Sequence, residues 1–169
     1  MKSFNFFKIL VILILITLNV SCDQVSKSVV RKNIVAFDKI EVIGNHLTLT
    51  KVENHGAALG FAATFPPAIK YVVIVILPII LLFAFFLSIL YRKDIDKTII
   101  VGLTFIIGGG IGNLFDRIFY GSVTDFVILD LGIFKTGIFN MADLSVTIGV
   151  LIIGFSSLLS LKKTMVTEK

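Results

Sequence analysis

Four apolar segments constrain this chain more than any other feature, because each is close to the length that crosses a lipid bilayer. They lie at about residues 6–22, 68–91, 98–112 and 137–161, and ~20 helical residues span the hydrocarbon core. Hydrophobic residues make up 56% of the 169 positions, which is more than a soluble domain of this size could bury. The third segment is short, so its glycine-rich end must lie near the surface or be covered by protein. We therefore predict an all-α membrane protein with four transmembrane helices.

The basic residues predict how these helices are oriented. No basic patch interleaved with aromatic residues occurs, so membrane topology explains the net charge of +5 better than nucleic acid binding does. Excess Lys and Arg marks cytoplasmic segments, and it occurs here at both chain ends and between the second and third spans. These residues are Lys2, Lys8, Arg92, Lys93, Lys97, Lys162, Lys163 and Lys169. The loops at about 23–67 and 113–136 are then expected outside, although the first also carries basic residues that acidic neighbours nearly cancel.

Alternating β-branched residues predict a small β element in the first outer loop, at about residues 36–65. Two alternating runs, Ile40–Ile43 and His46–Val52, flank Gly44-Asn45. A two-residue turn of this type between such runs is typical of a β-hairpin. The outer loop is therefore expected to carry a small sheet or hairpin.

Prolines and a second mixed stretch shape the rest of the chain. Pro66-Pro67 suits the start of the second span, and Pro78 inside that span is expected to kink it. Residues 122–139 either add a strand to the outer sheet or lie flat at the interface. No repeat or linker divides the chain, so residues 1–169 are expected to form a single integral membrane domain.

Cys22 allows two interpretations of the first segment. An apolar stretch ending in Asn19-Val-Ser-Cys22 imitates the signal peptide of a bacterial lipoprotein. Such signals usually place Leu where this chain has Asn19, and the remainder holds three further spans. We therefore favour a retained first helix with Cys22 packed at its end. A single cysteine also excludes an intramolecular disulfide and a CxxC metal site.

Two aspartates lie where an apolar chain tolerates charge poorly. Asp143 lies a few residues into the fourth span and must face protein or a water-filled cleft, although Asn140 and Asp143 could instead simply cap the helix. Asp125 lies in a short outer loop. Two carboxylates meeting at one interface can share a proton, deprotonate a water and protonate a leaving amide nitrogen. Asp116 and Asp130 are alternative members of such a pair.

Other polar residues each have a structural and a functional interpretation. Arg117 follows Asp116 directly, so the two side chains need not pair; Arg117 either binds a carboxylate, phosphate or substrate carbonyl or reaches toward lipid headgroups. Asn113 can orient a backbone. The glycines between Gly108 and Gly112 permit close helix approach or a bent helix end, but no Lys-Ser/Thr follows as in a phosphate loop.

The outer loop and the first span contribute further candidates. Asn54 can hydrogen-bond a substrate or a carboxylate, or it stabilises a turn. Asp23 at the outer end of the first span has interfacial solvation as its simplest explanation. His46 and His55 lack companions at zinc spacing, so no metal site is expected, and no histidine is placed to serve a serine nucleophile.

Five ordered motifs resemble the lipoprotein signal peptidases, the type II signal peptidases of bacteria. The motifs are Asp23-Gln-x-Ser-Lys27, Asn54-x-Gly-Ala-Ala58, Gly108-Gly-x-x-Gly112-Asn113-x-x-Asp116-Arg117, Val123-x-Asp125-Phe126 and Phe139-Asn140-x-Ala-Asp143. The resemblance covers essentially the whole chain. It implies an intramembrane aspartyl protease of the bacterial inner membrane, with its active site toward the periplasmic face. Such a protease removes the signal peptide of a prolipoprotein just before the cysteine that carries diacylglycerol.

The resemblance also implies roles for particular residues. Asp125 and Asp143 would form the catalytic pair, and Asp116 would be structural. Residues that bind substrate or support the pair would be Asp23, Lys27, Asn54, Gly56, Asn113, Arg117 and Asn140. The family's outer β-cradle and periplasmic arm would correspond to the hairpin and to the stretch from Asn54 to Phe61. The chain departs from the family pattern at Leu59, where an aromatic is common, and at Thr124, where an apolar residue is frequent.

The expected partners are diacylglyceryl-prolipoprotein substrates and membrane lipids, with no nucleic acid, metal or organic cofactor, and the chain is expected to be a monomer. Two other functional classes are open. A small transporter or proton relay would spread its acids across the membrane depth, whereas these acids gather on one side. A lipoprotein or accessory subunit would be anchored through Cys22.

Overall fold

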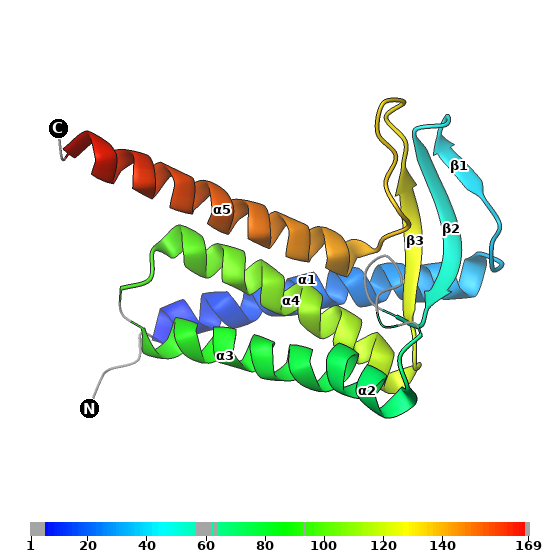
Figure 1. The fold of residues 1–169 in the computed structure, drawn as a ribbon. Coiled ribbons are helices and arrows are strands. Elements are labelled where there is room, and N and C mark those ends of the chain that lie inside the picture. The colour runs from blue at the N-terminus through cyan, green and yellow to red at the C-terminus, as the bar shows by residue number, and fades with distance from the viewer. Residues whose placement is uncertain (1–5, 57–61, 63, 93, 168–169) are drawn as a thin grey trace.

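Four long helices and one three-stranded sheet make up the fold. The computed structural model describes residues 6–56, 62, 64–92 and 94–167, and side-chain burial as far as Ser160. Its elements in chain order are α1 (Phe6–Asn33), β1 (Ile40–Ile43), β2 (Leu47–Asn54), α2 (Pro67–Tyr71), η2 (Val72–Ile76), α3 (Leu77–Tyr91), α4 (Lys97–Phe119), β3 (Val123–Leu129) and α5 (Met141–Thr167). Within these ranges, four helical stretches are long and apolar enough to cross a membrane. Figure 1 shows the sheet at one end of the helical bundle and both chain ends at the other.

The helical prediction is confirmed, but two of the expected boundaries are wrong. The third span was placed at about 98–112, whereas α4 continues through the glycines to Phe119. The glycine-rich end does not end the helix because neighbouring helices cover it. The fourth span was expected to begin near residue 137, whereas α5 begins at Met141 because Phe139 still pairs with a strand.

Glycines let α4 lie in direct contact with α1 and α5. A Cβ added at Gly108 would lie 2.6 Å from the Asn19 side chain, and one at Gly102 would lie 2.8 Å from the carbonyl oxygen of Gly149. A Cβ at Gly109 would collide with the Ala142 carbonyl oxygen. Such small residues allow helix backbones to approach closely in membranes. The close approach brings the polar half of α4 against the beginning of α5.

The second span contains a local irregularity where Pro78 was expected to disturb it. A turn of π-helix, η2, lies between α2 and α3, and the N–H of Leu77 donates to the carbonyl of Val72. Proline has no N–H to offer the carbonyl four residues earlier, so the ladder must adjust before it. Pro67 begins α2, as predicted for a proline at the start of a helix.

The predicted hairpin is confirmed and gains a third strand. The strand order is β1-β2-β3, and both pairs are antiparallel. Residues 122–139 therefore supply a strand, which pairs Val52 with Asp125 and Asn54 with Val123. Beyond β3 the chain turns back and Phe139 pairs with Val127. This second pairing fixes the start of α5 beside the strand that carries Asp125.

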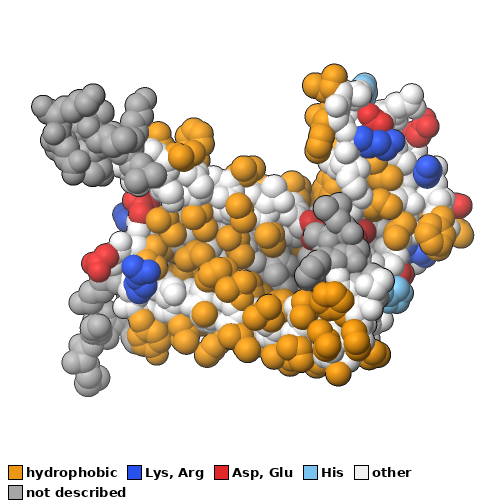
Figure 2. Space-filling view, viewed as in Figure 1, with side chains coloured by type: hydrophobic (Ala, Val, Ile, Leu, Met, Phe, Trp, Pro, Cys, Tyr) orange, Lys and Arg blue, Asp and Glu red, His pale blue; other side chains and the backbone are white. Residues whose placement is uncertain are grey.

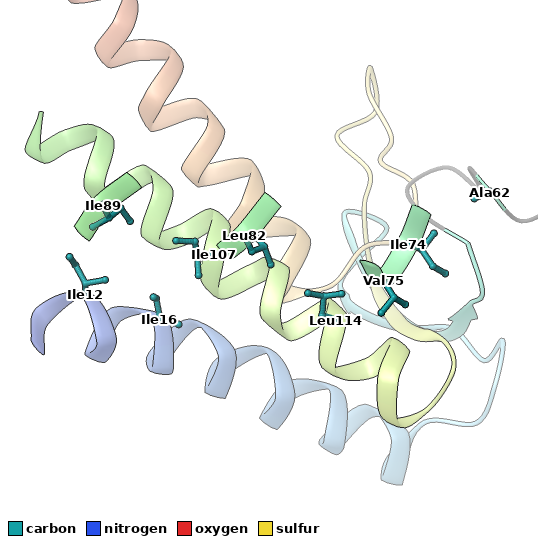
Figure 3. Close-up of a cluster of buried hydrophobic side chains, with 9 residues drawn as sticks. All are labelled: Ile12, Ile16, Ala62, Ile74, Val75, Leu82, Ile89, Ile107 and Leu114. Atoms are coloured by element: carbon teal, nitrogen blue, oxygen red, sulfur yellow. The ribbon is translucent and has the colours of Figure 1, made fainter. Parts of the chain in front are cut away.

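An apolar cluster holds α1, the second span and α4 together. Figure 3 shows it between these helices, and its members are Ile12, Ile16, Ala62, Ile74, Val75, Leu82, Ile89, Ile107 and Leu114. A smaller cluster of Val30, Ile34, Phe126 and Val127 joins the end of α1 to β3. The polar residues lie between these two clusters, at the end of the bundle that meets the sheet.

Candidate active site

Asp125 lies at the junction of sheet and bundle, almost hidden from solvent. It is 5% exposed, and both of its carboxylate oxygens accept hydrogen bonds from amides. Asn54 Nδ2 donates to Oδ2 at 2.9 Å, and Asn140 Nδ2 donates to Oδ1 at 2.6 Å. Figure 2 shows acidic side chains gathered where the sheet meets the helices. A carboxylate placed this way is a candidate for proton transfer, because it is desolvated and oriented.

Asp143 meets the same site from the first turn of α5. Asn140 caps this helix, since its Oδ1 accepts the N–H of Asp143 at 2.9 Å, while Asp143 Oδ2 accepts the N–H of Asn140 at 3.2 Å. Asn113 Nδ2 donates to Asp143 Oδ1 at 2.8 Å. The expected capping of α5 by Asn140 and Asp143 is therefore present. Asn140 caps α5 with one end of its amide and contacts Asp125 with the other.

Three asparagines face the two aspartates with amide orientations that their other contacts fix. Asn54 Oδ1 accepts the N–H of Gly56 at 2.9 Å. Asn113 Oδ1 accepts from Lys27 Nζ at 2.9 Å. Because each of these carbonyl oxygens has a donor, the NH₂ groups must point to the carboxylates. The same holds for Asn140, whose carbonyl end caps α5.

The pKa of Asp125 is raised from 3.8 to about 6. Burial is the largest cause, because it disfavours the charged form, and the charge of Asp143 acts in the same direction. The hydrogen bonds from Asn54 and Asn140 oppose this effect by stabilising the ionised carboxylate. Asp125 can therefore exchange a proton near neutral pH, which suits a general acid.

A buried ionic cluster supports the asparagines from behind. Lys27 is fully buried, and its Nζ lies 2.8 Å from Asp23 Oδ2 and 3.1 Å from Asp116 Oδ2. Asp23 Oδ1 accepts the N–H of Ala142 at 2.9 Å, so α1 also caps α5. Buried charges need such pairing to be tolerated. The cluster therefore ties α1, α4 and α5 together directly beneath Asp143.

Two members of this cluster were missed by the sequence analysis. Arg31 Nη2 lies 2.8 Å from Asp116 Oδ1, and its guanidinium stacks 4.0 Å from the centroid of the Tyr120 ring. Gln24 Nε2 donates to carboxylate oxygens of both Asp23 and Asp116 at 3.0 Å. The available signal was the spacing on α1, since Arg31 lies four residues after Lys27 and Gln24 three residues before it, and such residues share a helix face. Asp116 thus pairs with α1 and not with its neighbour Arg117.

Thr124 connects this cluster to the strand that carries Asp125. Its Oγ1 accepts from Arg31 Nε at 2.8 Å and donates to Glu53 Oε1 at 3.0 Å. The N–H of Thr124 donates to Asp116 Oδ2 at 3.2 Å. Thr124 is therefore fully buried as well as hydrogen-bonded. These contacts fix the position of the residue that precedes Asp125.

Arg117 points the other way, toward the two aspartates. Its electrostatic neighbours include Asp143 and Asp125, and its Nη2 donates to the carbonyl of Gly56 at 3.4 Å. Among the described side chains, the Arg117 Nε is a buried donor without a hydrogen-bond partner. A buried donor left without a partner costs free energy unless a ligand completes it. Arg117 is therefore available to a substrate carbonyl beside the carboxylates.

The remaining sequence expectations concern the outer arm, the histidines and Cys22. Most of the stretch expected to form the outer arm, residues 57–61, lies outside the described residues. His46 Nδ1 lies 2.8 Å from the carbonyl oxygen of Asp130 at the edge of the sheet. Over the described part of the chain, no group of three or more His, Cys, Asp or Glu side chains could hold a metal ion. The expectation that Cys22 packs at the end of the first helix is wrong, because α1 continues unbroken to Asn33 and the Cys22 side chain is exposed.

The arrangement supplies the groups that water-mediated hydrolysis of an amide needs. It has two carboxylates that both accept hydrogen bonds from Asn140, one from its side chain and one from its backbone N–H. The pKa of Asp125 is about 6, and the Arg117 guanidinium has a free donor beside them. One carboxylate can take a proton from water while the other gives one to a leaving nitrogen. No nucleophilic side chain is required.

Comparisons with known proteins find one family by sequence and a similar fold among solved structures. A family model described as signal peptidase (SPase) II matches residues 11–159. The lipoprotein signal peptidase of Wigglesworthia glossinidia brevipalpis is 38% identical over 133 residues, which cover 78% of this chain and 83% of the relative. That of Moorella thermoacetica is 36% identical over 147 residues, which cover 87% of this chain and 92% of the relative. A bacterial membrane enzyme solved by the in meso method at 2.3 Å resolution is similar with a TM-score of 0.80 and 29% identity, covering 100% of this chain and 96% of that chain.

Proposed function

This chain belongs to the signal peptidase II family, and on that premise we propose that Asp125 and Asp143 cleave prolipoproteins just before the diacylglyceryl-modified cysteine. The family consists of aspartic peptidases, so the chain is a multi-pass membrane enzyme that removes signal peptides from lipoproteins. The proposal adds which residues perform the reaction and where the bond is cut.

The observation that carries the proposal is the position of Asn140, whose side-chain NH₂ donates to the Asp125 carboxylate and whose backbone N–H donates to the Asp143 carboxylate. In the reaction, ionised Asp143 takes a proton from water, and the resulting hydroxide attacks the carbonyl carbon before the modified cysteine. Protonated Asp125 donates its proton to the leaving amide nitrogen, which is consistent with its pKa of about 6. The C–N bond breaks, and the water is divided between the new carboxyl and amine groups.

Arg117 and the asparagines prepare the site for this step. The free Nε of Arg117 would donate to a substrate carbonyl, and Gly56 and Asn54 would hold the edge where an extended peptide enters. Asn113 and Lys27 keep Asp143 oriented, and Asp23 fixes the start of α5. Donors that are already in place stabilise developing charge without having to reorganise.

The position of the site suits a substrate embedded in the same membrane. We place it at the periplasmic surface of the inner membrane, because the basic residues flank the opposite end of the bundle. The transmembrane part of the substrate and its acyl chains would then contact the apolar helices, among membrane lipids. One copy of the chain supplies both aspartates and all the amides described, so we propose that it acts as a monomer.

Cleavage by the purified protein tests the proposal. The substrate is a diacylglyceryl-modified prolipoprotein, and the unlipidated form serves as its control. Removal of either carboxylate, in Asp125→Asn or Asp143→Asn, is expected to lower kcat by about 100- to 10,000-fold, the range of general acid–base catalysis. The matched control is Asp94→Asn, at the far end of the bundle, which should cleave normally. Retained cleavage by a folded Asp143→Asn variant, or equal cleavage of both substrates, would refute the assignment.

A further inference from the structure

Three large apolar side chains stand exposed at the tip of the hairpin that joins β3 to α5. In this β3–α5 hairpin (residues 130–139), Leu131 is 62% exposed, Ile133 101% and Phe134 62%. Scattered exposed apolar residues are normal on a protein surface, but three within four positions form a patch. Such a patch indicates contact with an apolar partner.

The hairpin holds these side chains in a fixed arrangement. The N–H of Leu131 donates to the carbonyl of Phe134 at 2.8 Å, and Lys135 Nζ forms a salt bridge of 3.0 Å with Asp130 Oδ2. Gly132 makes the reversal with a φ of +77°, a conformation that glycine adopts readily, and its N–H donates to Asp130 Oδ1 at 3.0 Å. The tip therefore keeps its apolar groups outward and does not fold them against the sheet.

The hairpin lies on the side of the sheet that faces the lipid-exposed surface of α5. Figure 1 shows the strands running across the helix axes, so the sheet lies parallel to a bilayer that the helices cross. The same figure shows the β3–α5 hairpin on the side of β3 that faces α5. Figure 2 shows hydrophobic side chains on the side of the sheet that faces α5. Exposed apolar side chains occur along α5 itself, among them Leu144, Val150 and Leu158. The apolar tip thus overhangs a region that lipid must fill.

We propose that the tip of the β3–α5 hairpin inserts Leu131, Ile133 and Phe134 into the outer leaflet beside α5 and acts as an interfacial anchor. The occupant is bilayer lipid, because the patch continues the lipid-facing surface of the helices. The Asp130–Lys135 ion pair at the base of the tip would lie among the polar headgroups, as charged groups do beside apolar residues at membrane interfaces. The anchor is independent of the proteolytic proposal, since it needs only that the helices span a bilayer.

A single-tryptophan experiment tests the anchor. The chain contains no tryptophan, so a Phe134→Trp variant of the full-length protein carries one reporter at the tip. The protein is reconstituted into phosphatidylcholine vesicles with and without bromine on the upper acyl chain. The matched control is Phe37→Trp, because Phe37 is 75% exposed and lies in the loop that joins α1 to β1. Figure 1 shows this loop on the opposite side of the sheet from α5. Ile133→Trp serves as a second reporter if Phe134→Trp folds poorly.

The anchor predicts opposite behaviour at the two positions. The tip reporter should emit at shorter wavelength, lose intensity in brominated lipid and resist aqueous iodide, without any prolipoprotein present. The Phe37→Trp reporter should emit as in water and be quenched by iodide only. A tip reporter that iodide quenches as strongly as the control, with no loss in brominated lipid, overturns the proposal. Equal quenching of both positions by brominated lipid also overturns it, because the whole sheet and not this tip would then meet the bilayer.

Discussion

At the scale of single residues, the site depends on amides whose orientation is fixed before substrate arrives. Asn140 connects the two aspartates, and Lys27 fixes Asn113 through its carbonyl oxygen. Sequence reasoning could select these residues because polar groups are rare in an apolar chain and need a partner. It could not predict which end of each amide faces which carboxylate, because that depends on helices that meet only in the folded protein.

The raised pKa of Asp125 predicts a measurable dependence of stability on pH. Burial favours the protonated form of Asp125 in the folded state. The contribution of Asp125 to the free energy of unfolding is therefore complete below pH 3.8 and is lost as the pH rises to about 6. A shift of roughly two units corresponds to about 3 kcal/mol. Between pH 4 and 7 the wild-type protein should therefore lose up to about 3 kcal/mol more of its free energy of unfolding than Asp125→Asn does.

Thermal unfolding in one detergent across this pH range measures the difference between the two proteins. Titrating groups that do not interact with Asp125 contribute equally to both proteins and cancel. Parallel curves for wild type and Asp125→Asn would show that Asp125 does not carry a raised pKa.

The hydroxyl of Thr124 offers a second test at this scale. Thr124→Val keeps the shape of the side chain but leaves Arg31 Nε without its acceptor, and Glu53 keeps only the hydrogen bond from the Ser122 hydroxyl. Loss of one partner of a buried polar group costs about 1 to 3 kcal/mol, so the melting temperature should fall while cleavage is retained in part. The matched control is Thr147→Val, since the Thr147 hydroxyl is exposed and bonds only the carbonyl of Asp143 in its own helix. Equal destabilisation of both variants would contradict the role given to Thr124.

At the scale of elements, hydropathy predicted the existence of each helix better than its ends. The expected hairpin at residues 40–52 was confirmed because alternation and turn chemistry are local properties. The ends of α4 and α5 were misplaced because polar residues there are buried by contacts from α1 and β3. Arg31 and Gln24 escaped notice for the same reason, since only the packing of α1 against α4 turns them into partners of Asp116.

The contact between α4 and α5 should tolerate no added methyl group at Gly109. In Gly109→Ala the new Cβ meets the backbone of Ala142, directly beside the turn that carries Asp143. Overpacking typically costs about 1 to 3 kcal/mol, so both the melting temperature and kcat should fall. The control is Gly154→Ala on α5, where an added Cβ meets nothing within 4 Å. An unchanged melting temperature and kcat in Gly109→Ala would show that α5 can move away without cost.

At the scale of the whole molecule, both chain ends and the α3–α4 loop lie at the end of the bundle opposite the sheet. Because excess Lys and Arg marks cytoplasmic segments, we propose that this end is cytoplasmic. In a Cys22→Ser background, a cysteine introduced by Lys39→Cys should therefore react with a membrane-impermeant maleimide on intact bacterial cells. One introduced by Asp94→Cys should react only after the cells are opened. The reverse pattern would invert the orientation and with it the side on which the site opens.

The pairing of Val127 with Phe139 closes a loop in the chain. On the side of this pairing that carries Asp125 and Asp143, strand register and the cap of α5 fix the backbone. Residues 128–138 lie on the other side, so this loop can become longer or shorter while the two aspartates keep their spacing. The length of this loop can therefore vary separately from the proposed chemistry. A short epitope tag inserted there is expected to leave Asp125 and Asp143 in place.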